Sequence, residues 1–563
     1  MDERRLFSTT VPPVDRNTAG KRPLLNDGFV AAALGFIGLL LRLPLMTHGL
    51  WRDEGSTVVV IAQPSIPDVM QAIHRTEFTP PLYYLLERLW VSVAGTSEVA
   101  MRLPSLACSL AAIMLLYEAG RRMGSRFTGV IAALLAATSP LAISVGVEVR
   151  AYGFVLFLAT VVLYACVRTW LSTGLSERYG WAAMFSAAAL TLIATHPTGI
   201  VVVATLGVTV AVASAVRRCS NTDALLGGAL LAIAIALPIL AQLYYLAPRF
   251  TARGGPEPAG LGATIADNLT WFLPFRSMQA QAVLLLEFGA LLWLVTVLFR
   301  RKFDARDRWI VVVGSIVVAG VSISILRQLP QERHLLAYAP AAWLLFALLN
   351  SWFVSWLREP SQNLAWWGRV VMGAAAAYVL AGGVIGYPRA WRAAAAETSG
   401  ARELVGKLAR NHHHPILLVA IPENIGPSLW FYTRYDPDIM LRGVPHWVDP
   451  QYASYDPAPW MRSGFASYQA DRVEKFAALH QAAIVLAVYT TVTRSYNGIP
   501  FSEGLEVATI LERRHRIALV EHFGGTRESI DLVVFAGAGV PLGQRRSPRK
   551  LRLADPKFAS VAH

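Results

Sequence analysis

Cysteine and charge are both scarce in this sequence. Its 563 residues include 3 cysteines, and only 16% of the residues are charged, whereas an ordinary soluble protein carries roughly 25% charged residues. So few cysteines exclude a disulfide-stabilised scaffold. Hydrophobic residues make up 54% of the chain. The composition therefore excludes a disordered or collagen-like chain and indicates an integral membrane protein.

Several familiar motifs are also missing. The chain has no glycine-rich phosphate-binding loop, no cysteine pair and no zinc-protease motif. The run His412–His414 looks like a metal tract, but no acidic residue or cysteine stands at ligand spacing from it, so we interpret it as a solvated loop. We expect no obligatory metal and no other cofactor, with a divalent metal as the alternative.

Long apolar runs dominate the first 390 residues. Each is close to the roughly twenty residues that span a bilayer, and no Ala-x-Ala-like site follows the first run, which argues against a signal peptide. We expect about eleven transmembrane helices. They lie at 29–46, 103–117, 127–145, 152–170, 181–195, 199–216, 224–246, 282–298, 309–325, 335–356 and 370–387.

The few charges are divided unevenly between the two sides of the membrane. With a cytoplasmic N-terminus, nearly every inner loop is basic, as the positive-inside rule requires. The formal net charge of +14 is therefore mainly a topology signal, and we expect a multi-pass plasma-membrane protein with no nucleic-acid partner. Residues 1–27 are polar and basic and are expected to form a disordered cytoplasmic tail.

The region after the last apolar run has a different pattern of residue types, with short apolar runs between polar segments. An odd number of helices places it outside the cytoplasm. Short β-branched runs predict strands at 416–421, 483–489, 517–520 and 530–535, and helices are expected at 400–410, 470–481 and 502–515. The predicted fold class is a polytopic α-helical membrane protein, with transmembrane residues 28–387, an extracytoplasmic α/β domain at 388–545 and a disordered basic tail at 546–563.

The first external loop, residues 47–101, is the most informative segment. Asp53 and Glu54 directly follow the first apolar run, and carboxylates are costly to hold near hydrocarbon. A structural alternative is that Asp53 caps the next helix while Glu54 faces water. Further along, Glu77 precedes a Pro-Pro pair, which forces an extended entry into an amphipathic helix at 82–93 that could lie on the membrane surface.

Polar residues at the other external positions form a second set of candidates. They are Arg150, Tyr152, His196, Arg327, Arg333 and His334. Arg150 either pairs with Glu148 or faces a phosphate or carboxylate, and His196 is either a satisfied turn residue or a substrate contact. A carboxylate beside such cations suits one kind of reaction, because the carboxylate can remove a proton from a hydroxyl while cations stabilise a departing phosphate.

Five short motifs carry a family resemblance through their order and spacing. They are Pro80-Pro81-Leu82-Tyr83-Tyr84, Arg102-Leu103-Pro104-Ser105-Leu106, Arg121-Arg122-Met123-Gly124, Ser139-Pro140-Leu141 and Glu148-x-Arg150-x-Tyr152. This stretch resembles the integral-membrane glycosyltransferases of the C-type fold, and within them the group of protein O-mannosyltransferases, aminoarabinose transferases and rhizobial lipopolysaccharide sugar transferases. The likeness continues less sharply to residue 335 and does not cover the C-terminal region.

The resemblance implies roles for individual residues. Asp53 matches the family's general base, and Glu54 supports it or contacts the acceptor. Arg333 and His334 match residues that hold the donor phosphate, with Arg327 less closely matched. The candidates expected nearer the donor or the substrate are Arg150, Tyr152, His196 and Glu77. The implied reaction transfers a sugar, with inversion, from a polyprenyl-phosphate donor to an acceptor hydroxyl on the external face.

The identity of the sugar is predicted from the amino-acid composition alone. A sequence rich in alanine, valine and arginine favours a high-GC bacterium, and therefore mannose or arabinose on decaprenyl phosphate, with a glycan, glycolipid or protein as acceptor. Two other classes are a flippase for lipid-linked sugars, which would place ionisable residues near the bilayer midplane, and a non-catalytic glycan-binding membrane scaffold. The clustering of candidate residues on the external side favours the enzyme.

Overall fold

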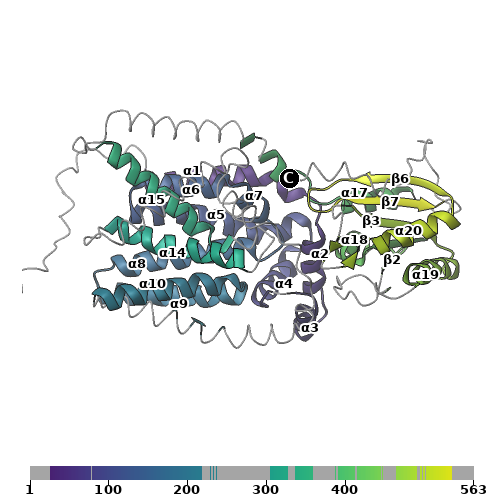
Figure 1. The fold of residues 1–563 in the computed structure, drawn as a ribbon, viewed down its shortest axis with the longest axis horizontal. Coiled ribbons are helices and arrows are strands. Elements are labelled where there is room, and N and C mark those ends of the chain that lie inside the picture. The colour runs from purple at the N-terminus through teal and green to yellow at the C-terminus, as the bar shows by residue number, and fades with distance from the viewer. Residues whose placement is uncertain are drawn as a thin grey trace, which may run out of the picture.

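The computed structural model describes residues 26–77, 79–217, 305–326, 336–358, 391–411, 415–444, 464–490 and 502–535, together with isolated positions between them. Figure 1 shows a bundle of helices at one end of the molecule and a sheet with its own helices at the other. Helices α2 and α4 lie between the two, where the bundle meets the C-terminal region.

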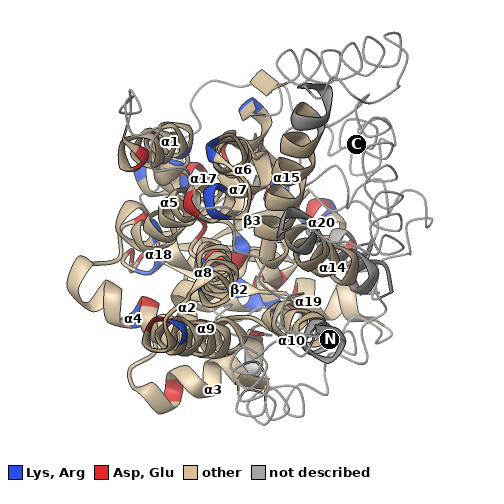
Figure 2. Ribbon diagram, turned by 90° about the vertical axis from the view of Figure 1, so that its left-hand side faces the viewer, with Lys and Arg blue, Asp and Glu red and all other residues tan. Residues whose placement is uncertain are grey.

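Long apolar helices build the bundle. In the described part of the chain, three segments are long and apolar enough to cross a membrane: α1 with the turn η3 (Asp27–Thr47), α5 (Glu98–Met123) and α8 (Tyr152–Leu171). The other helices of the bundle are α6 (Arg126–Thr138), α7 (Pro140–Val145), α9 (Leu175–Thr195), α10 (Thr198–Arg217), α14 (Ala305–Leu326) and α15 (Ala339–Arg358). Charged residues are sparse along these helices, as Figure 2 shows.

Within the described ranges, the expected spans coincide with helices, and the one at 127–145 is divided into two. The expected spans at 224–246, 282–298 and 370–387 lie almost entirely outside the described residues, so the count of eleven stays a prediction. The same holds for the two tails expected at 1–27 and 546–563, since the described chain begins at residue 26 and ends at residue 535.

The span expected at 127–145 is not one helix but two, α6 and α7. Helix α6 ends at Thr138, and because Pro140 has no N–H group, the carbonyl of Ala136 has no helical partner there. Arg42, a fully buried residue at the end of α1, donates to that carbonyl at 3.1 Å and to the Ser109 hydroxyl at 3.0 Å. One buried cation thus joins α1, α5 and α6 at the break.

The first external loop is helical along most of its length. It contains α2 (Arg52–Ile61), α3 (Ile66–Thr76) and α4 (Leu82–Ala94). Helix α4 confirms the helix expected at 82–93. It buries Tyr83, Tyr84 and Glu87 and leaves Leu89 and Val93 exposed, which is the pattern of a helix with one face toward lipid.

The C-terminal region contains a five-stranded mixed sheet of order β2-β1-β3-β7-β6. Its strands are β1 (Ile416–Ile421), β2 (Ile439–Gly443), β3 (Ala483–Tyr489), β6 (Ile517–Phe523) and β7 (Ile530–Phe535). Strand β1 is parallel to β2 and β3, and β7 is antiparallel to β3 and β6. Four of the five strands coincide with the apolar runs that predicted strands, whereas β2, a short edge strand, was not predicted.

Helices cover both faces of this sheet. Because successive side chains of a strand point to opposite faces, Leu418 packs in the core beneath α17 (Ala401–Asn411) and α18 (Gly426–Thr433), and Leu417 packs in the core beneath α19 (Phe465–Leu479) and α20 (Ser502–Arg514). Helix α18 in turn packs on α2. The α17–α18 side of the sheet therefore connects the C-terminal region to the first external loop.

Candidate active site

Asp53 lies in the first turn of α2. Trp51 occupies the cap position and Arg52 begins the helix, so the alternative that Asp53 caps this helix is wrong. Asp53 is 8% exposed, and its Oδ1 accepts a hydrogen bond from the Nε of Arg52 at 3.0 Å. The amino end of a helix favours negative charge through its unpaired N–H groups. The Arg52 guanidinium and the start of α2 therefore both stabilise negative charge on the Asp53 carboxylate.

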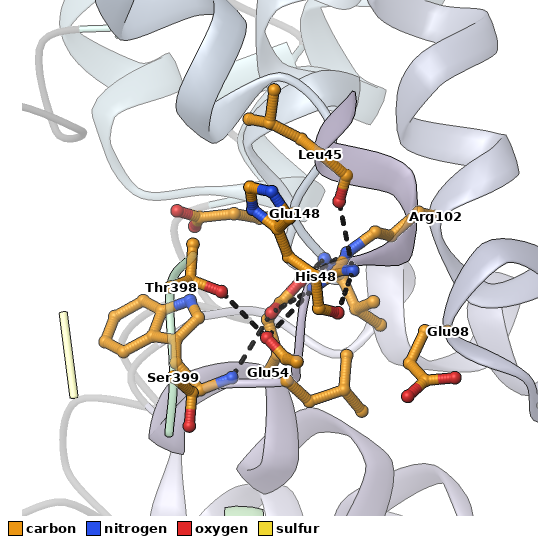
Figure 3. A network of polar contacts seen from close by, with 12 residues as sticks. Leu45, His48, Glu54, Glu98, Arg102, Glu148, Thr398 and Ser399 are labelled. Carbon is orange, nitrogen blue, oxygen red and sulfur yellow. Dashed lines mark hydrogen bonds and ion pairs between the residues drawn. The ribbon is translucent and has the colours of Figure 1, made fainter. Parts of the chain in front are cut away.

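Glu54 is buried in the protein, so the alternative that it faces water is also wrong. The guanidinium of Arg102, a residue of α5, donates to both carboxylate oxygens of Glu54. Nε donates to Oε1 at 3.1 Å, and Nη2 donates to Oε2 at 2.7 Å. The backbone N–H of Val149 also donates to Oε1, at 2.9 Å. Figure 3 shows this pair with His48 and Glu148 around it. Both oxygens of Glu54 therefore have protein partners.

Arg102 is anchored on its other side by the end of η3 and the turn after it. Its guanidinium also donates to the backbone carbonyls of His48 at 2.6 Å and Leu45 at 3.2 Å. A fork that satisfies a carboxylate and backbone carbonyls together fixes the geometry of both partners. The Glu54–Arg102 pair thus ties α2 to α5 and to the turn at residues 45–48.

Arg150 pairs with Glu77 and not with Glu148. Its Nη1 lies 3.0 Å from Oε2 of Glu77, and it also donates to the hydroxyl of Thr57 at 3.2 Å and to the carbonyl of Asp53 at 3.3 Å. Arg150 therefore joins α2 to the segment before α4. Of the candidate residues, the structure brings Asp53, Glu54, Glu77 and Arg150 into one connected network.

Electrostatics reinforce the position of Arg150. Burial alone would lower the pKa of its guanidinium, but the negative charge of Glu77, with contributions from Tyr84 and Asp53, outweighs burial and raises the pKa well above its ordinary value. The Tyr84 hydroxyl donates to the same Oε2 of Glu77 at 2.7 Å. Arg150 is thus permanently charged, and its positive charge interacts electrostatically with Asp53.

Tyr152 and His196 form a second, neighbouring pair. Their ring centroids lie 5.9 Å apart, and both residues are buried. Nδ1 of His196 lies 2.7 Å from the hydroxyl of Thr198, which gives this histidine the local partner expected of a turn residue. The pair connects the start of α8 to the turn after α9.

Arg327, Arg333 and His334, expected to hold a phosphate, lie outside the described residues, as does the run His412–His414. Within the described ranges, no group of three or more His, Cys, Asp or Glu residues could hold a metal ion. The expectation that no metal is obligatory stays a prediction.

Four residues of this network had no role predicted from the sequence, although one of them, Arg102, belongs to one of the five motifs. They are Arg52, Arg102, Arg527 and Glu528. Arg102 lies inside an apolar helix, where an arginine needs a carboxylate or backbone carbonyls as partners, and this is the feature of the sequence that could have identified it. Arg527 pairs with Glu148 at 3.0 Å, and Glu528 accepts the backbone N–H of Arg52 at 2.9 Å. Both lie in a polar turn of the C-terminal region, where the sequence offers no sign of a buried role.

Comparison with solved structures shows the fold. The structure superposes on crystal structures of ArnT from Cupriavidus metallidurans, one bound to undecaprenyl phosphate (TM-score 0.54) and one in the apo state (TM-score 0.55), each with 15% sequence identity. The match with the bound form covers 92% of this chain and 100% of the ArnT chain. The match with the apo form covers 91% of this chain and 98% of the ArnT chain. No curated protein sequence matches this chain.

A sequence comparison agrees with the motifs. Residues 79–241 match the family model described as dolichyl-phosphate-mannose-protein mannosyltransferase. This range includes all five motifs that carry the resemblance, which the match confirms. The chain therefore has the ArnT fold, and residues 79–241 have the sequence pattern of the mannosyltransferase family.

Proposed function

We propose that this chain is a membrane-embedded glycosyltransferase that moves one sugar from a polyprenyl-phosphate donor to an acceptor hydroxyl on the external side of the membrane. The observation that carries the proposal is the ArnT fold, found along nearly the whole chain and seen in ArnT with undecaprenyl phosphate bound. The network at the start of α2 supports it, because a buried carboxylate bonded to Arg52, on a residue whose backbone carbonyl is bonded to Arg150, stands where the resemblance expects the base.

The proposed reaction is a single displacement. Asp53 takes the proton of the acceptor hydroxyl, the acceptor oxygen bonds to the anomeric carbon, and the bond from that carbon to the phosphate oxygen breaks, with inversion. The electron pair leaves with polyprenyl phosphate, which is a good leaving group. A hydroxyl is a weak nucleophile at neutral pH, so a positioned base is worth about 10²–10⁴-fold in rate.

The other residues of the network take supporting roles in this proposal. Arg52 and Arg150 orient Asp53 and the backbone around it, and Glu54 positions α2 through Arg102 because both of its oxygens are already engaged. The departing phosphate is assigned to the cations outside the described ranges. They are Arg327, Arg333 and His334.

The finer identity of the substrates also belongs to the proposal. We assign mannose or arabinose on decaprenyl phosphate as the donor, and a glycan, glycolipid or protein as the acceptor. Transfer is proposed to need no divalent metal. Turnover that persists in excess EDTA would support this assignment, and turnover that stops in EDTA and returns with added metal would contradict it.

The test uses the full chain in proteoliposomes with radiolabelled decaprenyl-phosphate mannose or arabinose and a membrane extract as acceptor. Wild type should release decaprenyl phosphate and label the acceptor. Asp53→Asn should insert and fold normally but lose about 10²–10⁴-fold in transfer. The matched control is Asp68→Asn in α3, an acid of the same loop whose partner is the Ser65 hydroxyl, and its transfer rate should equal that of wild type.

The same assay separates the other classes of function. A flippase would relocate the donor across the bilayer without consuming it, and a glycan-binding scaffold would do neither. Transfer by Asp53→Asn at the wild-type rate would contradict the assignment of the base.

A further inference from the structure

Glu528 is a fully buried carboxylate in the turn between β6 and β7. Its Oε1 accepts hydrogen bonds from the hydroxyls of Ser399 and Ser428, each at 2.7 Å. Its Oε2 accepts the backbone N–H of Arg52 at 2.9 Å. Each of these donors comes from a different segment of the chain, so one carboxylate joins three segments.

The third of these bonds ends on the first residue of α2. The first N–H groups of a helix have no partner inside the helix, and a side-chain oxygen usually supplies one. Trp51, at the cap position, has no side-chain acceptor to offer. The acceptor for the Arg52 N–H therefore comes from Glu528, 476 positions away in the sequence, while Glu54 of the same helix accepts the Trp51 N–H at 3.4 Å. A negative charge there also favours the helix dipole.

The turn before α2 is held by the same region. The Gly49 N–H donates to the Glu397 carboxylate at 2.6 Å, and the Gly49 carbonyl accepts from the Thr398 hydroxyl at 2.7 Å. The Leu50 N–H donates to the Tyr432 hydroxyl at 2.7 Å. Figure 3 shows Thr398 and Ser399 beside Glu54. Consecutive backbone groups before α2 are thus bonded to the C-terminal region.

Two further contacts join the C-terminal region to the first external loop and to the turn before α8. The Arg527 guanidinium pairs with Glu148 at 3.0 Å and lies 4.9 Å from the ring centroid of Trp51. In α2, a Cβ on Gly55 would come within 2.6 Å of the backbone of Pro427 and Ser428 in α18. The two helices meet backbone to backbone, which leaves α2 little freedom to shift.

Charge couples Glu528 to Asp53 as well. Burial raises the pKa of Glu528 to about 7, while the two serine hydroxyls and the positive charge of Arg52 oppose that rise. The Arg52 guanidinium also bonds to Asp53. Of the other charged groups nearby, Arg527 is paired with Glu148, and Glu397 bonds to the Gly49 N–H.

We propose that Glu528 is a positioning residue for the transfer reaction, which fixes the amino end of α2 and so holds the Asp53 carboxylate at the reacting hydroxyl. The C-terminal region then completes the active site. This inference rests on the proposed function, and it concerns a residue that does not itself touch the substrates.

The test measures structure and turnover separately in the full-length protein. In Glu528→Gln the amide presents a donor where only acceptors are needed, so amide hydrogen exchange at residues 52–58 should accelerate. The turnover number should fall about tenfold, the size expected for one hydrogen bond to a charged group. The KM for decaprenyl-phosphate mannose or arabinose should not change. Because burial raises the pKa of Glu528 to about 7, its negative charge is present mainly above pH 7, so the loss of turnover in Glu528→Gln should be largest above pH 7 and smaller below it.

Two variants control this experiment. Ser428→Ala removes one of the two hydroxyl donors to Oε1 of Glu528. Because Ser399 still donates to that oxygen, exchange and turnover should change in the same direction but by only about threefold. Glu474→Gln changes an acid of α19 that pairs with Arg514 and His515 at the far side of the sheet, and it should behave as wild type. Normal exchange and normal turnover in both Glu528→Gln and Ser428→Ala would overturn the inference while leaving the proposed function intact. A wild type that consumes no donor would instead refute the proposed function, and the exchange measurement would still test the contact.

Discussion

Helices α2 and α4 belong to the same external loop, yet they bury a glutamate in opposite ways. In α2, Glu54 is paired with Arg102 through two hydrogen bonds. In α4, Glu87 is equally buried, but no cation among the described residues pairs with it and neither oxygen has a hydrogen bond of normal geometry. Burial raises the pKa of Glu87 to about 8, and the Tyr83 hydroxyl opposes this rise.

The difference shows two ways to hold a carboxyl group away from water. Removing a charge from water is costly unless a partner compensates. Glu54 has the Arg102 guanidinium as its partner, whereas Glu87 keeps a proton and is neutral below about pH 8. The Glu54–Arg102 ion pair connects α2 to α5 and so fixes the orientation of α2, whereas Glu87 gives α4 no such ion pair among the described residues.

At a fixed pH, the largest effect is expected from breaking the pair in α2. Arg102→Met leaves Glu54 as a buried charge without its cation, so the free energy of unfolding should fall by about 3–5 kcal/mol. Thermal unfolding in detergent measures this. Adding Glu54→Leu to the same chain should recover most of the loss, and a double variant no more stable than Arg102→Met would show that the pair is not the cause.

The next effect concerns Glu87 and depends on pH. Between its ordinary pKa near 4.5 and the folded value of about 8, the folded protein binds a proton that the unfolded chain does not. Stability should therefore fall as pH rises through this range, by at most about 1.4 kcal/mol per pH unit, and level off above it. Glu87→Gln should remove this slope. A slope that persists in the variant would assign it to another group.

The smallest effect is expected from Tyr84, on the same buried face of α4. Its hydroxyl lies 2.7 Å from both Glu77 and Thr79. Tyr84→Phe should lower the free energy of unfolding by about 1 kcal/mol, because Arg150 still holds Glu77 in the variant. Denaturant or thermal unfolding measures the change, and a loss as large as that in Arg102→Met would mean that α4 depends on polar contacts as much as α2.

Local patterns in the sequence predicted some elements well. The Pro-Pro pair and the amphipathic run after it located α4, and β-branched runs located four of the five strands. These features depend on residues close together in the chain. The adjacency of Asp53 and Glu54 to the first apolar run likewise pointed to the start of α2 as the candidate site.

Partnerships between distant residues could not be predicted in the same way. Arg150 has Glu148 two positions away, yet it pairs with Glu77, 73 positions earlier. The choice depends on how α2 and α4 pack against the start of α8, which no local pattern contains. Glu528 is a stronger case, since a glutamate in a polar turn normally faces solvent, and only the packing of the C-terminal region on α2 buries it.

The contacts around Gly49 and Arg52 also have a consequence for the order in which the protein is made. The first external loop leaves the ribosome hundreds of residues before Glu397, Tyr432 and Glu528 are synthesised. Until the β6–β7 turn is complete, the backbone at 49–52 lacks these partners. A chain that stops short of residue 528 would insert its helices with the start of α2 unsupported, so we expect maturation of the site to be among the last events of biosynthesis.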